Sequence, residues 1–198
     1  MAIKVVILDY DGTILNTFFG ISRISTLAKV LCFKYLKRCY LLLELIETCL
    51  HIRWPLHTPS VACIRYVKKE GLLVGIATGR SALGLVRSAR RSGMDLKCMD
   101  FIHVRSSIVD AWTVPDQQAL ILRSHGRKET PQGLASITRW LVAHGISLSE
   151  VLFVGDDATD RHAALLHGFT FIMVDRYGPD FGQVYKLIVQ KASEIPGV

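Results

Sequence analysis

The sequence predicts a doubly wound α/β fold with a parallel, Rossmann-like sheet, because short apolar runs alternate with amphipathic segments along most of the chain. Continuous β-branched and aliphatic runs of this length are typical of strands buried on both faces of a sheet. Each run stops at a polar or glycine-containing turn. The three clearest predicted strands are Ile3–Leu8, Leu72–Ala77 and Val151–Val154.

Helical patterns lie between these strands. The first carries apolar residues at helical spacing and ends at Gly71, a residue suited to a helix C-terminus. The predicted helices are Ser60–Glu70, Ser81–Ser92 and a segment that Thr130-Pro131 opens and Gly145 ends. Two further short runs, Phe101–Val104 and Phe169–Val174, are candidate strands.

Residues 18–58 interrupt this alternation after the first strand. Apolar side chains between Leu31 and Leu50 fall on one stripe of a helical wheel, with most charges on the other side. We therefore expect residues 1–17 and 59–198 to form the core domain, with 18–58 as a small helical insertion beside it. The insertion either covers the core or forms a homodimer interface. The stretch 108–126 is a second candidate for a lid or contact surface.

Composition indicates one globular domain. The chain has 198 residues, half of them hydrophobic, and a net charge of +7, which suits anionic substrates. Its five cysteines include no CxxC pair, so neither a disulfide framework nor a zinc site is expected. Charged residues interrupt the apolar stretch Leu27–Leu50, and the N-terminus lacks signal-peptide anatomy. We expect a cytoplasmic protein with no membrane association.

Two carboxylates follow the first predicted strand, in Asp9-Tyr10-Asp11-Gly12-Thr13. A turn there lets both point into one crevice. Asp9 could attack phosphorus and carry an aspartyl-phosphate, while Asp11 could protonate the leaving oxygen and later activate water. An acidic turn without chemistry is the alternative interpretation of this pair alone.

A second acidic cluster, Gly155-Asp156-Asp157-Ala158-Thr159-Asp160, follows the strand Val151–Val154. Together with Asp9 it would gather carboxylates that repel one another unless a cation lies between them. Mg²⁺ prefers such oxygen ligands. We favour Asp156 as a metal ligand over Asp157 and Asp160, either of which could instead cap the helix that begins near Thr159.

Thr78-Gly79-Arg80 follows another strand and offers a hydroxyl and a glycine amide for phosphate oxygens. Arg80 could add a charge or could be solvated. One further cation is expected to balance the nucleophile and the transferred phosphoryl group. Lys128 is our candidate because it stands just before the helix that Thr130 opens, with Arg123 and Arg127 as alternatives.

Ligands of open α/β sheets bind beyond the carboxyl ends of the strands. Asp9, Thr78 and Asp156 all lie at such ends, so segments far apart in sequence are expected to meet in one crevice.

At these positions the chain resembles the haloacid dehalogenase-like (HAD) hydrolases, and their phosphatase branch in particular. Four short segments resemble the family's four motifs in order: Asp9-x-Asp11-Gly12-Thr13, Thr78, Lys128 and Gly155-Asp156-Asp157-Ala158-Thr159-Asp160. The similarity covers about residues 3–17 and 60–174. It implies Mg²⁺ held by the Asp9 carboxylate, the Asp11 backbone carbonyl and Asp156. It also places the insertion 18–58 where this family often carries a substrate-selecting cap.

The resemblance narrows the chemistry, because Asp11 favours phosphatases and phosphomutases over dehalogenases and ion-pumping ATPases. We therefore expect a Mg²⁺-dependent phosphatase of a small phosphomonoester, with phosphomutase as the alternative. A nucleic-acid-end phosphatase or a nucleic-acid-binding module that uses the basic surface is a further alternative, against which the four motifs argue.

Overall fold

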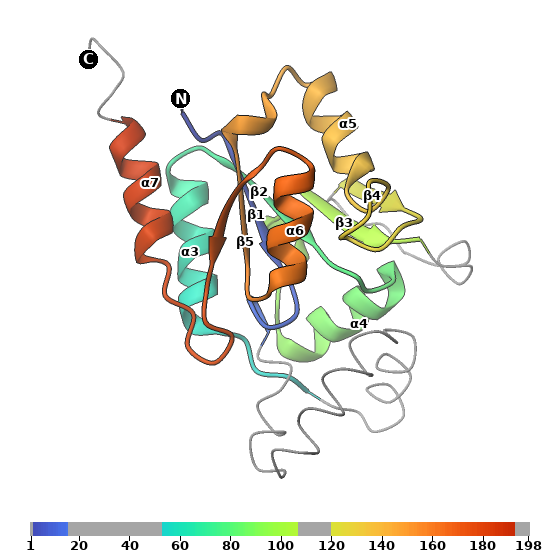
Figure 1. Cartoon of the computed structure of the whole chain (residues 1–198). Coiled ribbons are helices and arrows are strands. Elements are labelled where there is room, and N and C mark those ends of the chain that lie inside the picture. Colours follow the sequence, from blue (N-terminus) through green and yellow to red (C-terminus); the bar gives the residue numbers. More distant parts are fainter. Residues whose placement is uncertain (1, 16–52, 107–119, 193–198) are drawn as a thin grey trace.

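A computed structural model describes residues 2–15, 53–106 and 120–192, and its centre is a six-stranded, all-parallel sheet (Figure 1). The strands lie in the order β4-β3-β2-β1-β5-β6. Their bounds are β1 Val5–Asp9, β2 Leu73–Ala77, β3 Phe101–Arg105, β4 Leu120–Ser124, β5 Val151–Gly155 and β6 Thr170–Met173. The predicted doubly wound α/β class is confirmed.

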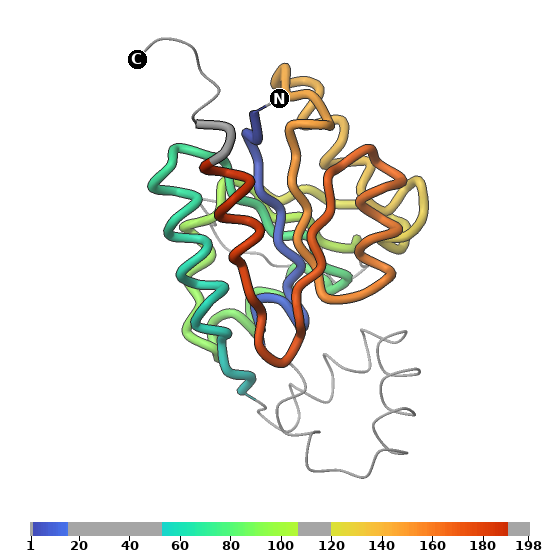
Figure 2. The backbone as a smooth tube through the Cα atoms, turned by 60° about the vertical axis from the view of Figure 1, so that its left-hand side comes forward, coloured from blue at the N-terminus to red at the C-terminus, as the bar shows by residue number. Residues whose placement is uncertain are grey.

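Helices cover both faces of this sheet (Figure 2). The α-helices are α3 Thr58–Lys69, α4 Ala82–Ser92, α5 Ala135–Ala143, α6 Ala158–Leu166 and α7 Gly182–Ala192, and the 3₁₀ turns are η2 Leu96–Cys98 and η4 Leu148–Glu150. Alternate residues of β1 divide the core into two layers. Val6 and Leu8 pack with α3, α4 and α7, whereas Val5 and Ile7 pack with α5 and α6.

Local signals explain several helix ends. Ser81 caps α4, since its Oγ accepts from the Gly84 amide at 3.0 Å, and Gly93 ends that helix in the left-handed region with φ 76°. Asp157 caps α6 by accepting from the Asp160 amide at 2.9 Å. The apolar faces of both helices then lie on the sheet.

The order of the strands determines where a ligand site can form. The chain moves from β1 outward through β2, β3 and β4, then returns to the other side of β1 with β5 and β6. Such a switch in direction opens a crevice beyond the carboxyl ends of the two central strands. Asp9 is the last residue of β1 and pairs with Ala77 of β2, which places it beside Thr78.

Several sequence-based expectations need correction. The edge strand β4 lies inside the stretch 108–126, which was expected to act as a lid or contact surface, and it was missed because its apolar run is short and stops at Arg123. Helix α5 begins at Ala135, since residues 128–134 form turns. Helix α7 was not predicted at all, and α3 begins at Thr58, two residues earlier than expected.

The segment just before α3 contacts the loop after β1. The His57 amide donates to the Ile14 carbonyl at 2.9 Å, Leu56 forms a β-bridge with Leu15, and Trp54 is buried in the core. The rest of the predicted insertion, and the predicted contact surface at 108–119, lie outside the described residues. No helix within the described ranges has both the length and the hydrophobicity to cross a bilayer.

Candidate active site

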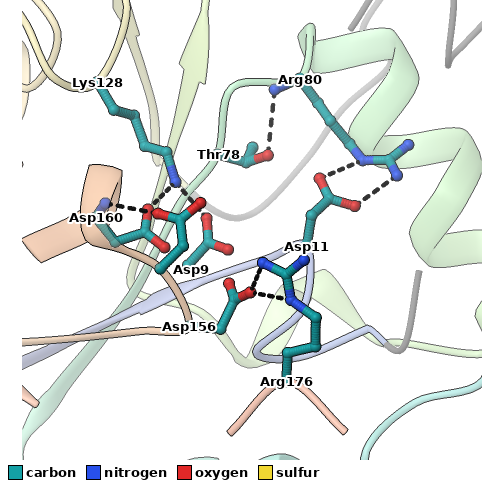
Figure 3. A network of polar contacts seen from close by, with 9 residues as sticks. Asp9, Asp11, Thr78, Arg80, Lys128, Asp156, Asp160 and Arg176 are labelled. Carbon is teal, nitrogen blue, oxygen red and sulfur yellow. Dashed lines mark hydrogen bonds and ion pairs between the residues drawn. The ribbon is translucent and has the colours of Figure 1, made fainter. Parts of the chain in front are cut away.

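Three carboxylates meet beyond the carboxyl ends of β1 and β5 (Figure 3). Asp9 ends β1, Asp156 follows β5, and Asp160 lies in the first turn of α6. One oxygen from each lies within 4.8 Å of the others. Asp9 and Asp160 are almost completely buried, as is the side chain of Asp156. Three like charges so close together require cations.

Gly12 allows the loop after β1 to approach Asp156. Its φ is +92°, a conformation that L side chains rarely adopt, and a Cβ there would lie 2.5–2.8 Å from the carboxylate atoms of Asp156. The backbone of the Asp9–Thr13 turn therefore lies against the Asp156 carboxylate.

Lys128 bridges two of the three carboxylates. Its Nζ donates to Oδ1 of Asp9 and, at 2.5 Å, to Oδ1 of Asp160. The turn that carries it depends on Gly133, where a side chain would overlap with the backbone oxygens of Arg127 and Lys128. Lys128 is buried in contact with Asp9 and Asp160, whereas the alternatives Arg123 and Arg127 are exposed.

Arg80 binds the second carboxylate of the Asp9-x-Asp11 pair. Its Nε donates to Oδ2 of Asp11 at 2.8 Å and its Nη2 to Oδ1 at 2.6 Å. The Arg80 side chain is fully buried, and its Cζ lies 5.6 Å from the centre of the Tyr10 ring. The interpretation of Arg80 as a solvated side chain is therefore wrong, because it forms a buried fork-to-carboxylate pair.

Arg176, in the loop after β6, binds Asp156. Nε donates to Oδ2 at 2.7 Å, and Nη2 donates to the same oxygen. Every carboxylate of the cluster consequently has a cationic partner, Lys128 for Asp9 and Asp160 and Arg176 for Asp156.

A buried histidine lies next to this arrangement. His103 of β3 shares a hydrogen bond of 2.9 Å between its Nε2 and Ser124 Oγ, which in turn is 2.9 Å from Ser136 Oγ. The pKa of His103 is lowered from 6.5 to about 3, first by burial and then by the charge of Lys128, while a hydrogen bond with the Gly133 backbone opposes the shift. His103 is therefore neutral at physiological pH and links β3, β4 and α5 behind the Lys128 turn.

The donor atoms of the carboxylate cluster fit a hard divalent cation. Oδ1 of Asp156 and Oδ2 of Asp160 are buried without a hydrogen-bond partner, which is costly for carboxylate oxygens in a protein interior. An all-oxygen set of this kind suits Mg²⁺. Asp9, Asp156 and Asp160 are the residues that could hold it.

The structure gathers most of the predicted site residues. Thr78 is buried beside β1, its amide donates to the His103 carbonyl at 3.0 Å, and its Oγ1 accepts from the Arg80 amide at 3.2 Å. Gly79 lies in the same turn. Asp157 is not in the cluster, because its side chain caps α6, and the Asp11 carboxylate is occupied by Arg80. Asp160, which the sequence ranked below Asp156, is a full member.

Sequence reasoning missed two residues, Arg176 and His103. Arg176 follows the strand β6, and that position was the available signal, whereas His103 lies in the middle of β3 and gave no such signal. A single arginine or histidine in a loop or strand carries too little pattern to be selected on its own.

Neither a protein-family model nor a curated protein matches the sequence. Solved structures do match. A HAD-superfamily hydrolase from Ehrlichia chaffeensis has a TM-score of 0.58 and 17% identity over 97% of this chain and 99% of its own. An L-2-haloacid dehalogenase has a TM-score of 0.59 and 16% identity over 97% and 100%. A putative phosphoglycolate phosphatase from Lactobacillus delbrueckii subsp. bulgaricus has a TM-score of 0.56 and 14% identity over 89% and 87%. The chain therefore has the fold of the HAD-superfamily hydrolases.

Proposed function

We propose that this chain is a Mg²⁺-dependent phosphatase that hydrolyses a small phosphomonoester through an aspartyl-phosphate on Asp9. The observation that carries the proposal is the buried cluster of Asp9, Asp156 and Asp160 with Lys128 bridging two of its members. A carboxylate nucleophile can approach a phosphate dianion only where cations offset the charge of both.

In the first step an Asp9 oxygen attacks phosphorus and the bond from phosphorus to the ester oxygen breaks. Asp11 gives its proton to the leaving oxygen, which departs as an alcohol. In the second step Asp11 takes a proton from water, the water oxygen attacks phosphorus, and the bond to Asp9 breaks. Inorganic phosphate leaves, and both carboxyl groups return to their starting states.

The remaining residues hold the phosphoryl group. The Thr78 hydroxyl and the Gly79 amide are donors beside Asp9, and Lys128 brings a positive charge to the same oxygens. Asp9, Asp156 and Asp160 would hold Mg²⁺, which supplies charge stabilisation to the phosphoryl oxygens when bound.

Dehalogenases occur among the structural neighbours, so the choice between C–halogen and P–O cleavage rests on Asp11. A halide is a stable leaving group and needs no proton, whereas an alkoxide needs one. A buried second carboxyl two residues after the nucleophile supports ester cleavage.

The test is phosphate release from an aryl phosphate and a metabolite panel, with Mg²⁺ and with a chelator, beside halide release from 2-haloacids. We expect Mg²⁺-dependent phosphate release that Asp9→Asn abolishes. Intact-mass measurement after rapid acid quenching should detect one added phosphoryl group on wild type and none on Asp9→Asn. Asp95→Asn is the matched control, since Asp95 is exposed and its side chain accepts from the Lys97 amide, which Asn can also do. Halide release without phosphate release would contradict the proposal.

A further inference from the structure

We propose that Arg176 is an internal cation that competes with the divalent metal for Asp156, so that metal binding has to displace its guanidinium. This inference rests on the metal requirement of the proposed function and on no other part of it. The loop after β6 would then control how tightly the site binds its metal.

The contact is a buried ion pair on one oxygen. Nε and Nη2 of Arg176 both donate to Oδ2 of Asp156, while Oδ1 is buried without a hydrogen-bond partner. The Asp156 side chain is fully buried and that of Arg176 is 12% exposed. Figure 3 shows the Arg176 guanidinium over Asp156 and between it and Asp11, on the side of the cluster away from Lys128.

The charges identify Arg176 as the surplus cation. Three carboxylates contribute −3, and Lys128 and Arg176 contribute +2, which leaves −1. A divalent metal together with Lys128 would balance −3 without Arg176. With Arg176 still on Asp156, binding of the divalent metal would change the net charge of the site from −1 to +1, and the two cations would repel each other at short range.

In the opposite role, Arg176 would orient Asp156 and so strengthen metal binding. Removal of its guanidinium would then weaken metal binding. The Gly12 backbone also lies against the Asp156 carboxylate and restricts its orientation without Arg176. Little conformational freedom is left for the guanidinium to remove. Charge repulsion therefore outweighs positioning.

The loop that carries Arg176 is held by hydrogen bonds that do not involve the guanidinium. A substitution of the Arg176 side chain therefore tests the guanidinium and not the path of the loop. The Val174 amide donates to the Gly155 carbonyl at 2.9 Å, and the Tyr177 amide donates to Asp175 Oδ1 at 3.0 Å. The backbone of Arg176 also forms a hydrogen bond with His57. The loop should keep its path when the guanidinium is removed.

The experiment measures metal affinity of the whole chain without substrate. Mn²⁺ binding is followed by electron paramagnetic resonance and Mg²⁺ binding by calorimetry, for wild type, Arg176→Gln and Arg161→Gln. Arg161 is the matched control because it is an exposed residue of α6 and its loss changes the formal charge equally. We expect Arg176→Gln to bind both ions about tenfold more tightly, with a change below about twofold for Arg161→Gln.

Thermal unfolding gives a second readout. Arg176→Gln should lower Tm in chelator, where Asp156 loses its partner, and this deficit should shrink when the metal is saturating. Equal or weaker metal binding by Arg176→Gln overturns the inference and leaves the phosphatase proposal standing. If no variant binds either ion, both the inference and the metal requirement are wrong.

Discussion

Arg80 and Asp11, 69 positions apart in the sequence, form a buried two-point ion pair at the entrance to α4. Both carboxylate oxygens accept from the guanidinium, at 2.8 and 2.6 Å, so neither is directed at a leaving group in this arrangement. Under the proposed mechanism, Asp11 has to turn out of this fork and take up a proton before it can act as the acid. The pair thus links the stability of the β1 loop to the acid step.

Arg80→Met should destabilise the chain strongly, because it leaves the Asp11 carboxylate buried without a cation. We expect the free energy of unfolding to fall by about 3–5 kcal/mol, the range for breaking one partner of a buried pair. Urea unfolding followed by circular dichroism measures the change.

A double-mutant cycle separates the pair from general damage to the core. Asp11→Asn combined with Arg80→Met removes both charges, so the double variant should be more stable than the sum of the single losses implies by more than about 1 kcal/mol. Additive losses would mean that the two side chains do not act as a pair.

Lys128→Met should remove the cation shared by Asp9 and Asp160. In chelator we expect a loss of about 3 kcal/mol in the free energy of unfolding, since two buried carboxylates then face each other. Saturating Mg²⁺ should recover part of this loss while phosphate release stays at least about 100-fold below wild type. The exposed Lys97→Met is the control and should change neither quantity. Unchanged stability in chelator would contradict the bridging role of Lys128.

The central strands and their polar ends were predictable because each signal is local. Ile3–Leu8 with Asp9, Leu72–Ala77 with Thr78, and Val151–Val154 with Asp156 each place an apolar run directly before a polar turn. Parallel pairing then brings these ends to one edge, as β1, β2 and β5 confirm. Lys128 could be selected because it stands just before the predicted helix that Thr130-Pro131 opens.

The other features of the fold and of the site depend on tertiary contacts that leave no local pattern in the sequence. Arg80 and Asp11 pair through tertiary packing, and nothing in Thr78-Gly79-Arg80 indicates whether the guanidinium turns to solvent or inward. Arg176 reaches Asp156 only because β6 lies next to β5. The edge strand β4 has too few buried residues to produce a strand pattern, and the capping role of Asp157 could not be separated from metal binding by sequence alone.

Gly12→Ala tests the close approach of the β1 loop to Asp156. The new Cβ would lie 2.5–2.8 Å from the Asp156 carboxylate and would also strain a backbone at φ +92°. We expect the strain alone to cost about 1–2 kcal/mol in the free energy of unfolding. Displacement of Asp156 should weaken Mn²⁺ binding by at least about tenfold in addition.

Gly71→Ala is the matched control for the backbone strain that alanine causes at a positive φ. Gly71 has φ +72° and open space around it, so alanine there is strained without a clash. It should lower stability to a similar extent and leave Mn²⁺ affinity unchanged. Equal Mn²⁺ affinity in both variants would mean that Gly12 serves the turn and not the Asp156 carboxylate.

His103 predicts a specific loss of stability in acid. Its pKa is about 3 in the folded chain, against 6.5 ordinarily, so below about pH 6.5 the unfolded chain binds a proton that the folded chain does not. The free energy of unfolding should therefore fall as pH falls from about 6.5 towards 3, by up to about 1.4 kcal/mol per pH unit from this group. Urea unfolding of wild type and His103→Gln between pH 7.5 and about pH 4.5 isolates the contribution.

His103→Gln should be less stable than wild type at pH 7.5, because Gln fits the Ser124 hydrogen bond less well, and its stability should depend less steeply on pH. The exposed His162→Gln is the control for the loss of a histidine side chain. Histidine NMR provides the direct check, because the His103 ring signals should not titrate between pH 5 and 8. A His103 resonance that titrates near 6.5 would show that the imidazole is not enclosed behind the Lys128 turn, and the predicted acid sensitivity would then disappear with it.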